Sequence, residues 1–479
     1  MNNIFKTAVY GILSYSATIV GAQDIIAAPK IVVGITIEQL SLEKLSELTS
    51  ILSKNGLNKI VSNSQIYSNV EFNFTPIDRI SAISAINTGT NPYYNGIIGN
   101  KWFDKKYHET KNCIDDINFL GINTLEQYSA ENILTSTIGD ELRFQSNGKS
   151  MVYSFAMNAE DAIVYAGHNA NGAYWINSQN KEWCTSSYYN KTLPEWVEKH
   201  NKRHNEEDRK ADFNTRITNL AIDCIKEKNL GSDNNTDLIY IYYKPQDKTA
   251  NKLTTNDYKK YLIQTDANIE RLLDSLCERI DISNILFIIS GTIEEENNQT
   301  SKSDKIRHPG GTFHTDRATN LLNMYLGAKY GTDKYIDGYY SNQIYFNDKI
   351  QDRKNLTYQD IVCQSKIFLR QLQGVSNTMS GDEMLSNGLM ENKFRNGYNS
   401  KASGDLIIEL TPGWKISDEE TREAVDLQKI IGTSILLYGY NLKPDKVTSF
   451  TPADRITATI AKIINIRAPN ACKAMPLFQ

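Results

Sequence analysis

The 479-residue chain has few histidines and cysteines, two of the side chains from which compact zinc sites are built. It has only 6 histidines, and its 6 cysteines are far apart with no Cys-x-x-Cys pair, so the spacing of zinc fingers is absent. No basic stripe stands out against a net charge of −4, and nucleic acid is therefore not an expected partner. The cysteines are Cys113, Cys184, Cys224, Cys277, Cys363 and Cys472.

Beyond the N-terminus, no segment approaches the apolar length that a membrane span needs. Lys6 precedes the apolar stretch "AVYGILSYSATIVGA", which ends in a Val20-x-Ala22 pattern. This arrangement predicts a signal peptide over residues 1–22 and a periplasmic or secreted protein, because the stretch is too short and too rich in hydroxyls for an anchor. Cysteines of an exported protein are candidates for disulfides. Cys277, on an apolar helical pattern, fits a buried free thiol equally well.

Strand and helix signals alternate along the chain. Continuous apolar, β-branched runs predict strands that are buried on both faces, at 30–37, 237–243, 284–290 and 434–440. Helical spacing follows at 41–54, 255–280 and 451–465. This order predicts an α/β fold with a mostly parallel sheet sandwiched by helices. We expect a single domain over 23–479, with polar, tyrosine- and tryptophan-bearing cap insertions at about 100–235 and 295–430.

Ligands of such a sheet gather at the carboxyl ends of its strands. The residues to examine are therefore Glu38 and the stretches 75–81, 157–161, 244–251 and 291–296. One stretch, "FNFTPIDRISAISAINTGTNP" (72–92), has the form of a strand–turn–helix junction that could expose a nucleophile at a helix N-terminus. The side chain best placed there is Arg79, which is no nucleophile.

Five segments resemble the alkaline phosphatase superfamily. They are "VVGITIEQL", "TGTNPYYNGIIGNKWFD", "AGHNANGAYWIN", "NGYNSKASGDLIIELTPGW" and "LKPDKVTSFTPADRITATIAKIINI". They are most similar to segments of the secreted, zinc-dependent bacterial phosphomonoesterases with a threonine nucleophile. The segments follow one another in the same order as in those enzymes, from about residue 30 to the C-terminus. The resemblance implies a two-zinc site with aspartate and histidine ligands, at which a lysine, an arginine and an asparagine bind the phosphoryl oxygens.

Most positions that the resemblance assigns to this site carry other residues. Glu38 stands in place of a metal-binding aspartate, and Arg79 in place of the threonine nucleophile. The asparagine is kept as Asn100, whereas Asn158 and Glu160 replace the lysine and the arginine. The remaining metal-ligand positions fall at Asp247, Asn251, Thr292, Ile293 and Gly432.

The charges of the residues at these positions determine whether the site can bind a metal ion. Zinc prefers neutral imidazole and carboxylate ligands, and of the family's set only Glu38 and Asp247 remain. A permanent positive charge on Arg79 would repel a metal ion by about 4 kcal/mol per unit charge at ~4 Å and an effective dielectric near 20. We therefore expect no metal cofactor, although the family would use two zinc ions. Arg79 is predicted to act as the counter-charge of Glu38, and of Asp247 as well.

These replacements indicate a catalytically inactive, alkaline-phosphatase-like protein of the cell envelope that acts by binding or scaffolding. Its partner would be an envelope protein or an anionic ligand. Two alternatives stay open at this point. One is an active phosphoric-ester hydrolase with a divergent metal site. The other is a phosphate- or sulfate-group binding protein in which Arg79 and Asn100 grip the anion.

Overall fold

The computed structural model describes most of the chain. The described residues are 27–202, 211–246, 254–292, 310–352, 357–386, 393–418, 424–425, 427 and 433–478. The predicted signal peptide and the site positions Asp247, Asn251, Ile293 and Gly432 therefore lie outside the described residues. Among the described residues, no helix has the length and apolar character needed to cross a membrane.

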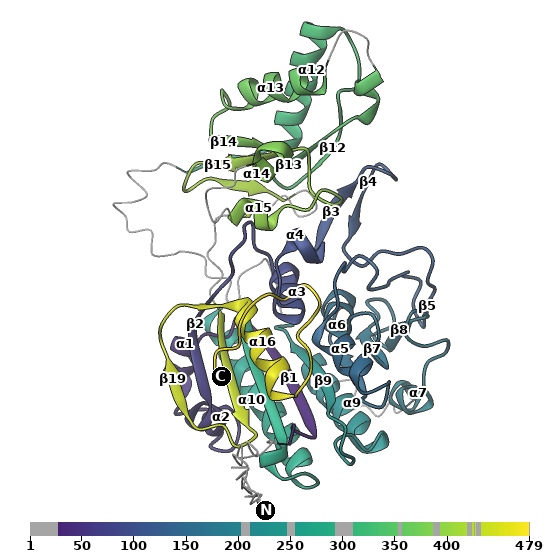
Figure 1. Cartoon of the computed structure of the whole chain (residues 1–479), viewed down its shortest axis with the longest axis vertical. Helices are drawn as coiled ribbons and strands as arrows, with labels where there is room; N and C mark the ends of the chain where they lie inside the picture. Colours follow the sequence, from purple (N-terminus) through teal and green to yellow (C-terminus); the bar gives the residue numbers. More distant parts are fainter. Residues whose placement is uncertain are drawn as a thin grey trace, which may run out of the picture.

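An 11-stranded sheet forms the body of the molecule, in the order β19-β2-β18-β10-β1-β9-β6-β7-β8-β5, with β20 paired to β2 (Figure 1). Its centre is parallel, because β1 pairs in parallel with both β9 and β10. The strands are β1 (Ile31–Glu38), β2 (Gln65–Glu71), β5 (Gly121–Ile122), β6 (Val152–Phe155), β7 (Gly172–Ile176), β8 (Trp183–Ser186), β9 (Asp237–Tyr243), β10 (Ile285–Thr292), β18 (Thr433–Gly439), β19 (Asp445–Val447) and β20 (Thr451–Pro452).

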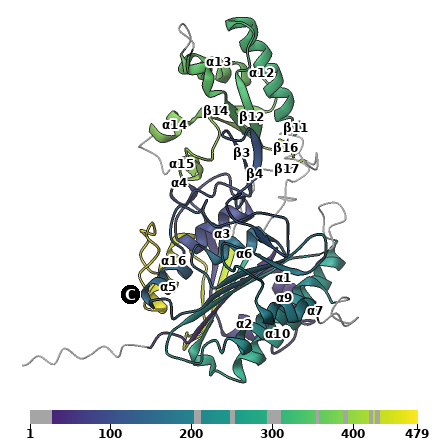
Figure 2. The ribbon, with the colours of Figure 1, turned by 90° about the vertical axis from the view of Figure 1, so that its right-hand side faces the viewer.

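Helices cover both faces of this sheet (Figure 2). Alternate residues of β1 explain why: Val32 packs into the apolar cluster on one face, and Ile31 and Val33 pack into the cluster on the other. The first face is covered by α3 (Arg79–Thr88), α5 (Ile138–Gln145), α6 (Ala159–Ala166) and α16 (Ala453–Ile463). The second is covered by α1 (Leu42–Leu48), α2 (Leu57–Asn63), α7 (Glu195–Lys202), α9 (Phe213–Glu227) and α10 (Thr255–Cys277). The expected α/β sandwich is confirmed.

A cap region, made of the described residues between 310 and 427, stands beyond one end of the sheet (Figure 1). It has an apolar cluster of its own. Its four-stranded sheet contains β12 (Ile336–Tyr340), β13 (Gln343–Phe346), β14 (Val375–Ser380) and β15 (Leu406–Leu410). A three-stranded sheet contains β11 (Thr312–Phe313), β16 (Lys415–Ser417) and β17 (Ala424–Val425). The helices are α12 (Thr315–Tyr330), α13 (Tyr358–Leu369), α14 (Gly381–Ser386) and α15 (Lys393–Gly397).

The stretch 100–235, expected to be a cap insertion, differs from that expectation over much of its length. Its beginning reaches the cap region through the hairpin of β3 (Lys101–Asp104) and β4 (Glu109–Asn112), where the Phe103 ring lies 5.3 Å from that of Tyr345. Farther on, β6, β7 and β8 are strands of the main sheet. These strands have only four or five residues each, too few to stand out as apolar runs among their polar neighbours.

The cysteines form no disulfide: Cys113, Cys184 and Cys224 are buried thiols, and Cys363 and Cys472 are thiols that are at least partly exposed. Cys277 is a free thiol as expected, but it is exposed rather than buried, because it lies at the last residue of α10. Disulfides therefore do not hold this fold.

His168 is a pH-sensitive side chain that lies between two hydrogen-bond acceptors. Its Nδ1 lies 2.9 Å from Asp140 Oδ2 and its Nε2 lies 2.7 Å from the Ile133 carbonyl oxygen, so both nitrogens face acceptors. Burial alone would lower the pKa of His168, but the hydrogen bond and charge of Asp140 raise it above the usual 6.5. The protonated imidazolium satisfies both acceptors.

We predict that His168→Gln lowers the free energy of unfolding by about 1–3 kcal/mol near pH 6, because it removes the charged hydrogen bond to Asp140 and leaves that carboxylate with backbone N–H donors alone. A raised folded-state pKa gives stability that is complete below the unfolded pKa and is lost as pH rises through the folded pKa. The difference between wild type and variant should therefore shrink toward alkaline pH in urea titrations. A difference that grows with pH would contradict the assignment. The control is His314→Gln, because the His314 side chain makes no capping hydrogen bond at the start of α12.

Candidate functional site

Glu38 is the last residue of β1 and lies at the carboxyl edge of the main sheet. It is buried, and its Oε2 accepts a hydrogen bond of 3.2 Å from the Tyr242 hydroxyl of β9. Its backbone pairs with Thr292, the last residue of β10. The backbone carbonyl of Glu38 accepts a further hydrogen bond, of 3.2 Å, from the Tyr261 hydroxyl of α10. β10 and α10 thus fix the backbone of Glu38, and Tyr242 of β9 contacts its carboxylate.

The turn before α3 is fixed by Asp78, the N-cap residue of that helix. Asp78 Oδ1 accepts from the Ser81 backbone N–H at 2.7 Å, and the Ser81 hydroxyl lies 3.0 Å from the Asp78 backbone N–H, which completes a capping box. Asp78 Oδ2 accepts from the Asn100 backbone N–H at 2.6 Å. Because both carboxylate oxygens are used, Asp78 ties the start of α3 to the loop that precedes β3.

Arg79, the first residue of α3, forms an ion pair with Asp161 of α6. The Asp161 side chain is 0% exposed and that of Arg79 is 18% exposed, so the carboxylate is removed from water and the guanidinium is mostly shielded from it. Neither carboxylate oxygen of Asp161 nor Arg79 Nη1 has a hydrogen-bond partner among the described residues, so the contact is one between opposite charges. The guanidinium carbon also lies 5.6 Å from the centroid of the Tyr242 ring.

The groups around Arg79 keep its guanidinium protonated. Burial disfavours the guanidinium and would lower the pKa of Arg79. The Tyr242 hydroxyl and the carboxylates of Glu38, Glu160 and Asp78 act in the opposite direction and raise that pKa. Arg79 is therefore a permanent positive charge set among acidic groups at the edge of the sheet.

Sequence reasoning did not find Asp161. The stretch 157–161 was among those to examine, but the resemblance carried over only Asn158 and Glu160 within it. The available signal was a pair of acids, Glu160 and Asp161, in the first turn of a helix that follows a buried strand. A buried arginine needs a carboxylate partner, and this turn offered one.

The other predicted residues lie around this centre. Glu160 Oε1 accepts a hydrogen bond of 2.6 Å from Asn112 Nδ2, so the β3–β4 hairpin holds it. Asn158 is the N-cap residue of α6 but makes no capping hydrogen bond. Asn100 contacts Asp78 through its backbone, and its Oδ1 is buried with no hydrogen-bond partner among the described residues.

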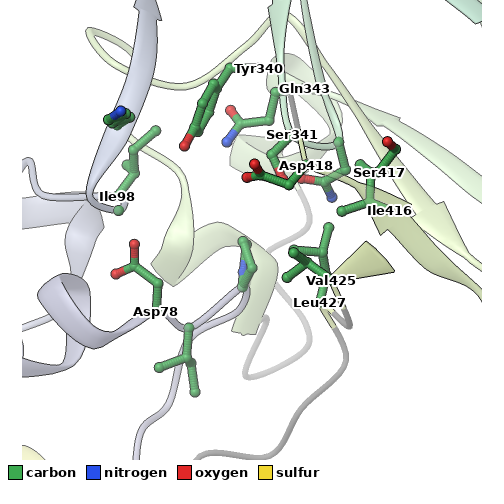
Figure 3. A pocket seen from close by; sticks show the side chains of 15 residues that line it. Asp78, Ile98, Tyr340, Ser341, Gln343, Ile416, Ser417, Asp418, Val425 and Leu427 are labelled. Atoms are coloured by element: carbon green, nitrogen blue, oxygen red, sulfur yellow. The ribbon is translucent and has the colours of Figure 1, made fainter. Parts of the chain in front are cut away.

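A cavity of about 170 Å³ opens beyond Asp78, between the main body and the cap region (Figure 3). The body contributes residues 76–78 with Ile98, Gly99 and Lys101. The cap region contributes residues 340–343 and 416–418 with Val425 and Leu427. Figure 3 shows the side chains of Asp78, Tyr340 and Asp418 around this space.

With this geometry in place, comparisons with known proteins give the family. The sequence profile of the type I phosphodiesterase/nucleotide pyrophosphatase family matches residues 32–434. The chain belongs to this family. The resemblance to the alkaline phosphatase superfamily is thereby confirmed, because the same chain is also similar to alkaline phosphatases over nearly its whole length.

Among curated proteins, the chain is 23% identical to alkaline phosphatase PafA of Elizabethkingia meningoseptica, over 99% of this chain and 98% of PafA. It is 24% identical to alkaline phosphatase PhoV of Synechococcus elongatus, over 93% of this chain and 92% of PhoV. A protein of Myroides odoratus named calcium-transporting ATPase is 23% identical, over 99% of each chain.

Among solved structures, wild-type PafA superposes with a TM-score of 0.81 at 21% identity, over 94% of this chain and 98% of PafA. Murine ectonucleotide pyrophosphatase/phosphodiesterase 5 gives 0.54 at 12% identity, over 91% of this chain and 95% of the murine chain. At these identities the likeness establishes the fold of the phosphodiesterase family and leaves the chemistry to the residues.

The described residues do not fit the two zinc ions that the resemblance implies. No group of three or more His, Cys, Asp or Glu side chains within the described ranges could hold a metal ion. Glu38 has tyrosine neighbours, and Asp161 is neutralised by Arg79. A guanidinium stands where the resemblance places a metal-bound nucleophile, and its charge opposes a metal ion there.

We predict that Arg79→Ala lowers the free energy of unfolding by about 3–5 kcal/mol near neutral pH, because it leaves Asp161 buried and unpaired. Removing both charges in Arg79→Leu/Asp161→Leu should cost much less than the sum of the two single variants in urea titrations. Arg317→Ala, at an exposed position of α12, is the control and should change little.

The same variant gives a pH test. Without Arg79, burial would raise the folded-state pKa of Asp161 above its unfolded value of about 3.9. A group with a raised folded pKa loses its contribution to stability as pH rises through that pKa. The cost of Arg79→Ala should therefore be smaller near pH 5 than near pH 8. Additive single variants, with a cost independent of pH, would show that the pair is not coupled.

Proposed function

We propose that this member of the family binds rather than hydrolyses, and that it works in the cell envelope as a binding or scaffolding protein. The observation that carries the proposal is the buried ion pair of Arg79 with Asp161, at the position where the resemblance places the nucleophile. A guanidinium stays protonated at every physiological pH and cannot attack phosphorus. In related catalytic sites, residues that act as a unit lose most of their effect when one is removed.

The alternative of a phosphate- or sulfate-binding protein is weaker. Arg79 is already paired with Asp161, and Glu38, Glu160 and Asp78 surround it with negative charge. An incoming anion would have to compete with these carboxylates for a single guanidinium. Envelope localisation is supported by the signal-peptide pattern of residues 1–22, and a single domain is supported by the family profile, which matches residues 32–434.

An active phosphoric-ester hydrolase is the second candidate, because two relatives that match along almost the whole chain are named alkaline phosphatases. This activity would need metal ligands or a nucleophile from residues other than Arg79. It would also have to operate beside a buried ion pair that fills the expected position. The activity assay below separates the two candidates.

We predict no phosphomonoesterase or phosphodiesterase turnover above background when the purified protein is supplied with zinc, magnesium or manganese. Arg79→Thr should not restore turnover, because the zinc ligands are replaced as well. The assay should use p-nitrophenyl phosphate and its bis ester, with Glu38→Ala as the control for contaminating enzyme. Turnover that survives purification and disappears in Glu38→Ala would favour the hydrolase.

A further inference from the structure

A groove of about 510 Å³ lies at the end of α3 that is far from Arg79. Four parts of the body line it: the last turn of α3, α4 (Pro92–Asn95), the start of α16 and the C-terminal residues 473–475. The cap region contributes Lys393 and Asn396 of α15, which lies beside α4 (Figure 1). A cavity of this volume is of the size that binds small organic ligands. It is separate from the ion pair of Arg79, so its ligand goes beyond the proposed function.

The groove carries large apolar side chains that water reaches. Phe450 is 58% exposed, Tyr94 is 42% exposed and Met475 is 76% exposed. Phe72 and Phe74 also line the groove and are at most 4% exposed. Single exposed apolar side chains are common, but several around one groove leave an apolar area for a ligand to cover. Since the Phe450 ring contacts no other ring among the described residues, it is available to an aromatic ligand.

Two cations of the groove have no carboxylate partner within the described part of the chain. The ammonium of Lys473 lies 5.1 Å from the centroid of the Tyr94 ring. Arg455 donates from Nε to the Met475 carbonyl oxygen at 3.1 Å and from Nη2 to the Pro476 carbonyl oxygen at 2.9 Å. A guanidinium has five N–H donors, so Arg455 keeps donors for an anion.

The acids that line the groove do not cancel these two charges. Glu71 Oε2 lies 3.9 Å from Lys393 Nζ, so the charges of these two residues offset each other. Asp454 is the other acid, and burial raises its pKa, which makes its charged form less favourable. Lys473 and Arg455 therefore outnumber Asp454, and the groove attracts anions.

We propose that this groove binds an aromatic carboxylate. Its ring packs against Phe450 and Met475, and its carboxylate accepts hydrogen bonds from Lys473 and Arg455. The cations and the apolar side chains lie next to one another, because Lys473 stands over the Tyr94 ring and the backbone of Met475 holds Arg455. A ligand that fits them carries its charge directly beside its ring.

The test is calorimetric titration of the full chain with naphthalene-2-carboxylate. We expect saturable binding that weakens with added salt. Naphthalene-2-carboxamide should bind more weakly, because it has the same shape without the charge. Octanoate should also bind more weakly, because it has the charge without the ring. Equal binding of the carboxamide, or tighter binding of octanoate, would overturn the inference.

Two exposed side chains of the groove can be changed with little effect on the core. Lys473→Gln should weaken binding about fivefold, because one charge contact is lost. Phe450→Ala should weaken it about tenfold, because the ring contact is lost. The matched controls Lys443→Gln and Phe144→Ala, at exposed positions outside the groove, should bind like wild type. No binding to wild type, or binding that is unchanged in both groove variants, would also refute the assignment.

Discussion

The ion pair between Arg79 and Asp161 is the interaction on which the chemistry of this molecule depends. A cation at the first position of a helix opposes the helix dipole, at a cost of about 0.3–1 kcal/mol. Arg79 is at that position in α3. In α6, Glu160 and Asp161 lie in the first turn, where the helix dipole favours acidic side chains. The acidic side chain of Asp161 at one helix N-terminus therefore neutralises the arginine at the other.

The fold is stabilised by residues other than this ion pair. The 11-stranded sheet, its two covering layers and the cap region depend on apolar side chains that lie away from the carboxyl edge. Replacing the residues at that edge leaves those layers unchanged, which is why a chain 21% identical to PafA superposes on it so closely. Fold and function are thus carried by different residues, and the function must be argued from the site.

The parts of the fold that sequence reasoning predicted are those with long, uninterrupted patterns. The runs at 237–243 and 284–290 became β9 and β10, and the helical spacing from Thr255 became α10. Shorter elements such as β6 carry too few residues for a period to be recognised. The helix expected over 41–54 ends at Leu48, earlier than its leucine spacing indicated.

The candidate site was predictable in position but not in detail. Strand ends and the resemblance placed Glu38 and Arg79 at one edge of the sheet, and the structure brings both to Tyr242. The partner of Arg79 could not be read from the chain, because Asp161 lies 82 positions away and only the packing of α3 against α6 brings it close. Tertiary contacts of this kind leave no local pattern.

The central claim is that a paired arginine occupies the place of a metal-bound nucleophile. The most direct measurement is a crystal structure from crystals soaked in zinc and orthovanadate, with anomalous data collected at the zinc edge. We predict no anomalous peak beside Glu38, no vanadate at the start of α3, and Arg79 paired with Asp161. Zinc peaks at the carboxyl edge of β1, with vanadate bound and Arg79 turned away from Asp161, would contradict the account.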